Sequence, residues 1–71
     1  MGKRNLSLTV TRKGRTEDTL DLYADPDDVS ALEKVLKGWL EGHGWHAGRW
    51  GEFALEVRHD GEGKVRRTVR A

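Results

Sequence analysis

The sequence contains no cysteine and a single proline, and its apolar residues never form a long run. Without cysteine, neither a disulfide nor a thiolate metal site can form. No apolar stretch approaches the roughly 18 residues of a membrane span, and the N-terminus lacks the apolar core of a signal peptide. The expected location is therefore the cytoplasm.

Charge of neither sign prevails, because 13 lysines and arginines face 12 acids and the net charge is +1. The charges are nevertheless segregated along the chain. Residues 1–15 carry five positive charges and no acid, whereas residues 16–33 carry seven acids and no base. Seventy-one residues suffice for one domain, residues 1–71, with a single two-layer core.

Residues 25–44 form the one segment with a helical period. One stripe at this period holds the apolar residues Val29, Leu32, Val35, Leu36, Trp39 and Leu40. Asp25 suits an N-cap and Pro26 suits the first helical position. The pattern predicts a helix over about 26–41, ended by a left-handed glycine, Gly42 or Gly44.

Four other segments alternate apolar and polar residues, as half-buried strands do. They span about residues 5–12, 16–23, 51–59 and 64–70. In the first pair, Leu8 must oppose Leu20 so that apolar side chains share one face. This register predicts a three-residue loop over residues 13–15. It also leaves Asp18 at the open end of the inner face.

For the last two strands, a register with Val57 opposite Val65 also places Glu56 opposite Arg66, a favourable pair of charges. A shift by two residues would set Arg58 against Arg66, so the first register is preferred. The preferred register brings Arg67 onto the inner face, where its aliphatic stem can cover apolar surface.

The order of elements is therefore ββαββ, and one helix can cover one face of a four-stranded sheet. This is an α+β fold. A right-handed crossover that makes the first and last strands parallel neighbours gives the strand order 2-1-4-3. In its element order the whole chain resembles the β-grasp architecture of ubiquitin-like and immunoglobulin-binding bacterial domains. No sequence motif accompanies the resemblance, so it implies no functional residue. A meander order is the alternative.

Two aromatic residues and an arginine are candidates for binding a partner. Trp50 is out of step with the alternation of its strand, so we expect it to be partly exposed beside Arg49. An exposed tryptophan next to an arginine is a common interface anchor and can also stack on a nucleobase. Packing under the loop is the structural alternative for Trp50. Tyr23 faces outward from its strand.

A second set of candidates is basic. With the 2-1-4-3 order, the central strands would carry a positive sheet face suited to nucleic acid. The set comprises Lys3, Arg4, Lys64, Arg66, Arg67 and Arg70. However, RNA-binding sheets usually display stacking aromatics, and an isoelectric point near 8.2 is below that of strongly basic domains. A solvated face with cross-strand ion pairs is the simpler interpretation.

The sequence offers little support for catalysis or for a cofactor. His43, His46 and His59 could ligate a metal, but no acid or cysteine at ligand spacing completes the set. No nucleophile lies in a recognisable pattern with a base, and no glycine-rich phosphate loop follows a strand. We therefore expect no enzyme activity, no metal, no cofactor and no small-molecule ligand.

The sequence thus predicts a small non-enzymatic protein-binding or adaptor module. Its interface would be the sheet face, a sheet edge or the loop around Arg49 and Trp50, and a homodimer formed through an edge is equally open. In general appearance the chain is similar to small accessory proteins of plasmids and phages. The alternative is an accessory nucleic-acid-binding protein that uses the basic residues.

Overall fold

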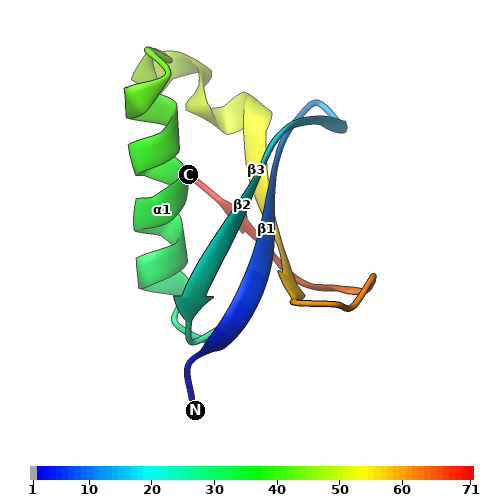
Figure 1. Cartoon of the computed structure of the whole chain (residues 1–71). Helices are drawn as coiled ribbons and strands as arrows, with labels where there is room; N and C mark the ends of the chain where they lie inside the picture. The colour runs from blue at the N-terminus through cyan, green and yellow to red at the C-terminus, as the bar shows by residue number, and fades with distance from the viewer. Residues whose placement is uncertain (1) are drawn as a thin grey trace.

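The computed structural model describes residues 2–71, and Met1, the first residue of the predicted domain, lies outside the described part. The elements are β1 (Arg4–Arg12), β2 (Arg15–Ala24), α1 (Val29–Gly42), the short 3-10 helix η1 (Ala47–Glu52), β3 (Phe53–His59) and β4 (Val65–Arg70). Figure 1 shows α1 on one side of the four strands. The predicted α+β class, with one α-helix and a four-stranded sheet, is confirmed.

The strand order is β2-β1-β3-β4, and every neighbouring pair is antiparallel. The predicted 2-1-4-3 order of a β-grasp fold is therefore wrong, and the observed order is meander-like. β3 lies beside β1, where Leu8 opposes Val57 and Val10 opposes Leu55. These pairs bury the same inward side chains as the expected order would have buried. The alternation of the sequence therefore could not distinguish the two orders.

In the first hairpin, the predicted pairing of Leu8 with Leu20 is confirmed, and Leu6 opposes Leu22 in the same register. The predicted three-residue loop is wrong. The loop has two residues, Lys13 and Gly14, with φ angles of 52° and 82°, as a tight hairpin turn requires. A bulge after Val10 makes the two-residue loop compatible with the pairing of Leu8 and Leu20. At the bulge, one residue of β2 has no partner opposite it.

The second hairpin also differs from its predicted register. Val69 opposes Leu55, and Arg67 opposes Val57, which is the register that the sequence disfavoured. A second irregularity places Arg58 opposite Val65 instead of Arg66. The anticipated clash between two arginines is thereby avoided.

Helix α1 begins later than predicted, at Val29. Asp28 is the N-cap, and its side chain accepts a hydrogen bond from the N–H of Ala31 at 3.1 Å. The carboxylate of Asp25 instead accepts the N–H of Asp27 at 2.9 Å, which is the pattern of an Asx turn. Pro26 therefore belongs to a turn before the helix, because the Asp25 side chain stabilises a non-helical backbone there.

The helix ends as expected at a left-handed glycine, which is Gly44 with a φ of 75°. The N–H of Gly44 donates to the carbonyl of Glu41 at 3.0 Å, and the N–H of Trp45 donates to that of Leu40 at 2.9 Å. These two bonds form a Schellman motif. They turn the chain back over the core and deliver it to η1.

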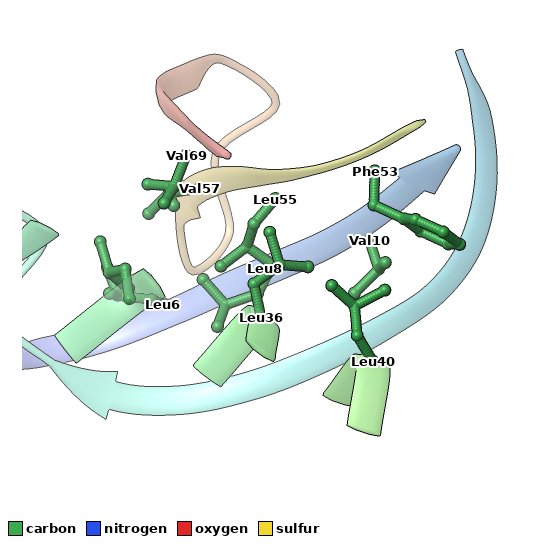
Figure 2. Packing of buried hydrophobic residues seen from close by; sticks show 10 residues of the cluster. Leu6, Leu8, Val10, Leu36, Leu40, Phe53, Leu55, Val57 and Val69 are labelled. Carbon is green, nitrogen blue, oxygen red and sulfur yellow. The ribbon is translucent and has the colours of Figure 1, made fainter. Parts of the chain in front are cut away.

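The core lies between α1 and the inner face of the sheet. Leu32, Leu36 and Leu40 of the helix are fully buried, and in Figure 2 the latter two point toward inward side chains of β1 and β3. The helix approaches β4 and β3 more closely than it approaches the other two strands. The inner side of β2 is therefore covered less completely than that of its neighbours.

Replacement by alanine of a glycine inside α1 and of a glycine just after it is expected to change the stability of the fold in opposite directions. Gly38 lies in the helix interior with nothing within 4 Å of an added Cβ, so Gly38→Ala should stabilise the fold by about 0.5–1 kcal/mol. Gly44→Ala should destabilise it by about 1 kcal/mol or more, because its left-handed backbone disfavours a side chain. Urea denaturation of both variants measures the two effects, and equal signs would contradict the assignment of the helix end.

Candidate functional site

The loop candidates, Arg49 and Trp50, both lie in η1 but point to different surroundings. The indole N–H of Trp50 donates to the carbonyl oxygen of Trp45 at 3.0 Å. Its ring is half-buried and packs against the core. Arg49 remains exposed and donates from Nε to the Glu52 carboxylate at 2.6 Å. Trp50 therefore packs under the loop, which was the structural alternative to a role as an interface anchor. Arg49, its neighbour in sequence, is exposed.

Glu52 joins three basic side chains at this end of the molecule. Besides Arg49, it contacts Arg12 at 2.8 Å and Lys13 at 3.8 Å. Hydrogen bonds from Arg49 and then Arg12 hold the pKa of the Glu52 carboxyl below its usual value. The guanidinium of Arg12 also lies over the ring of Trp45, 4.5 Å from its centroid. The cluster therefore closes one end of the core.

Sequence reasoning missed this cluster, although one signal was present. Arg12 continues the inward series of β1, and the structure places it opposite the fully buried Phe53. A charged residue at an inward position needs a partner or an exit to solvent. The position of Arg12 in the alternation could therefore have prompted a search for an acid.

Asp18 lies opposite Val10 at the end of the inner face, as predicted. One of its carboxylate oxygens accepts the indole N–H of Trp39 at 2.8 Å, and the other accepts the N–H of Thr19 at 2.8 Å. These two bonds, Trp39 first, hold the pKa of Asp18 below its usual value. The arrangement ties α1 to β2 and does not resemble a reactive site.

The three histidines lie in separate local environments. The ring of His43 stacks on Trp39 at 4.0 Å, and its Nδ1 lies 2.9 Å from the Trp39 carbonyl oxygen. His46 caps η1. His59 is mostly buried, with Nδ1 3.8 Å from the Glu62 carboxylate. Within residues 2–71, no three or more His, Cys, Asp and Glu side chains are grouped so that they could hold a metal ion.

The predicted basic sheet face is wrong, because β3 separates β1 from β4. The basic residues of β4 lie along an outer edge of the sheet instead. Arg66 pairs with Glu62 at 2.7 Å, and Arg67 reaches Asp27, in the turn before the helix, at 3.5 Å. Arg70 is the last residue of β4, at the end of the strand opposite to Arg66 and Arg67.

Part of the basic set does converge. Arg4, Arg66 and Arg67, together with His59, line a hollow of about 420 Å³ at the end of the sheet where β1 and β4 begin. Lys3 directly precedes Arg4, and Lys64 lies two residues before Arg66. The acids Asp27 and Glu62, which pair with two of the arginines, reduce the positive charge of the hollow. The pKa of Glu62 lies below its usual value because Arg66 donates to it.

The other edge of the sheet, β2, is apolar on its inner side and acidic along its length. Leu20 and Leu22 are half-buried, whereas Leu6 and Leu8 opposite them on β1 are 1% and 0% exposed. Tyr23 is 64% exposed and is the one large apolar side chain in the described residues with such exposure. It borders a hollow of about 310 Å³, which Asn5, Leu6, Asp21, Leu22, Tyr23 and Asp60 line.

No protein-family model, curated protein or solved structure matches the chain. In the part of the chain that the structure describes, no helix is long and apolar enough to cross a membrane. The chemistry of the exposed surfaces is therefore the basis for a functional proposal.

Proposed function

We propose that the chain is a non-enzymatic binding module that takes up an extended segment of a partner protein along β2. One observation carries the proposal. β2 is an edge strand of ten residues whose inward Leu20 and Leu22 are only partly buried because the helix lies nearer the opposite edge. An added strand would pair with the free backbone groups of β2 and would cover these two side chains.

The charge of β2 indicates the chemistry of the partner segment. Glu17, Asp18 and Asp21 lie along this edge, with Arg15 as the single base within the strand. Opposite charges across neighbouring strands stabilise a sheet, and like charges destabilise it. The segment should therefore alternate apolar and basic residues. Tyr23 supplies an amphipathic ring beside it, of the kind that often anchors interfaces.

Two synthetic peptides test this proposal. One alternates valine and arginine, and the other alternates valine and glutamate. Titration calorimetry should detect binding of the basic peptide and none of the acidic peptide. Asp21→Lys should weaken binding, because it places a positive charge against the arginines. Glu41→Lys makes the same charge change on the exposed side of α1 and should leave binding nearly unchanged. Equal weakening by both variants, or no binding of the basic peptide, would overturn the proposal.

A second function is favoured by the hollow that Arg4, Arg66 and Arg67 line. Guanidinium groups suit phosphate groups, so with three arginines around this hollow the chain would be an accessory nucleic-acid-binding protein. Binding to random DNA or RNA should then fall steeply between a low and a moderate salt concentration. Absence of binding at low salt would exclude this function and leave the first proposal untouched.

A further inference from the structure

The two edges of the sheet carry opposite charge. β2 bears Glu17, Asp18 and Asp21, and β4 bears Arg66, Arg67 and Arg70. Two β2 edges would repel each other, and so would two β4 edges, whereas β2 and β4 attract. The β4 edge of this chain therefore has the basic character that the β2 edge requires of its partner.

The direction of the strands allows these two edges to pair. β1 is antiparallel to both β2 and β3, and β4 is antiparallel to β3. β4 consequently runs opposite to β2. A second copy that is shifted sideways along the sheet, without rotation, would place its β4 antiparallel to β2 of the first. The sheet would then continue from copy to copy with all helices on one face.

One register of this contact satisfies both faces of the sheet. If Thr68 lies opposite Thr19, then Arg66 lies opposite Asp21 and Arg67 lies opposite Leu20. Thr19 and Thr68 share the outer face in the structure, since their partners Thr9 and Glu56 oppose each other. Arg67 belongs to the inner face through its pairing with Val57. Its aliphatic stem could therefore cover the part of Leu20 that remains exposed.

From these observations we infer that the partner of the β2 edge is the β4 edge of a second copy of this chain. The inference rests on the proposed use of the β2 edge and names the segment that it binds. Such a contact uses different surfaces on the two copies, so association is head-to-tail and open-ended, and each assembly keeps one free β2 edge at one end and one free β4 edge at the other.

Sedimentation velocity over a range of concentrations tests the inference with the intact chain. The sedimentation coefficient should rise with concentration and should fall when salt is added, because the contact is charged. Asp21→Arg and Arg66→Glu should each raise the concentration at half-association roughly tenfold, since each replaces an attraction by a repulsion. Both residues are exposed, and circular dichroism with urea denaturation verifies that each variant folds.

The double variant Asp21→Arg with Arg66→Glu restores an opposite-charge pair, so it should associate nearly as well as the original chain. Failure of the double variant to recover association would overturn the inference, and so would single variants that associate normally. A chain that stays monomeric at every concentration would also overturn it. If such a monomer still binds the valine–arginine peptide, the proposed function stands. If neither association nor peptide binding occurs, both fall.

Discussion

Replacement of Leu36 by alanine is expected to remove about 2–5 kcal/mol from the free energy of unfolding, the usual range for a buried leucine. Leu36 is 0% exposed and lies in the middle of the buried stripe of α1, between Leu32 and Leu40. A domain of 71 residues has a total stability of roughly 4–11 kcal/mol at the usual 0.05–0.15 kcal/mol per residue. The variant should therefore lose a large part of the stability of the fold.

Urea denaturation followed by tryptophan fluorescence measures this loss. Lys34→Ala is the matched control, because it removes an exposed side chain from the same helix. The control should stay within about 0.5 kcal/mol of the original chain. A midpoint for Leu36→Ala equal to that of the control would mean that the helix does not cover the sheet as described.

Trp50→Ala is expected to destabilise the fold by about 2–3 kcal/mol, somewhat below the range for a fully buried tryptophan. Its half-buried ring packs on the core, and its N–H bonds the Trp45 carbonyl at 3.0 Å. Trp50→Phe keeps one aromatic ring but loses the hydrogen bond and part of the packed ring, so it should destabilise the fold less than Trp50→Ala does and by about 1 kcal/mol or more. Chemical denaturation measures both variants.

Tyr23→Ala provides the contrast, because Tyr23 is 64% exposed. The free energy of unfolding of the Tyr23→Ala variant should differ from that of the original chain by no more than about 0.5 kcal/mol, while its binding of the valine–arginine peptide should weaken. If Trp50→Ala left stability unchanged, the tryptophan would be available as an anchor, and the loop would replace β2 as the preferred interface.

The sequence predicted the elements that a repeating pattern determines. Alternation in β1 and β2 located both strands and paired Leu8 with Leu20, because only that pairing puts the apolar side chains on one face. The apolar stripe of α1 identified Leu32, Leu36 and Leu40 as buried, because the helical period places them on one face. The start of α1 was misplaced because an aspartate before a proline can cap a helix or form a turn, and Asp25 forms the turn.

Features that depend on a single unpaired residue, or on the order of strands, could not be read from a pattern. Each hairpin contains an irregularity, after Val10 in one and after Val57 in the other, and each changes the register near it. The order β2-β1-β3-β4 buries the same side chains as the expected order but separates Arg66 and Arg70 from β1. The basic residues of β4 therefore lie on an edge strand and not, as predicted, in the middle of a sheet face.

The candidate interface along β2 could not be predicted from the sequence for a similar reason. The sequence identified Tyr23 as outward-facing, but the incomplete cover of Leu20 and Leu22 depends on where the helix lies across the sheet. Periodicity does not specify that position. The cytoplasmic location and the similarity to accessory proteins of plasmids and phages remain predictions from the sequence.

Residue-resolved amide hydrogen exchange, with and without the valine–arginine peptide, tests the use of the β2 edge most directly. A strand that is added to this edge would bond backbone N–H groups of β2 that now face outward. We predict that exchange slows within Arg15–Ala24 and stays nearly unchanged in β4 and in η1. Slowing confined to η1 or β4, with none in β2, would contradict the account.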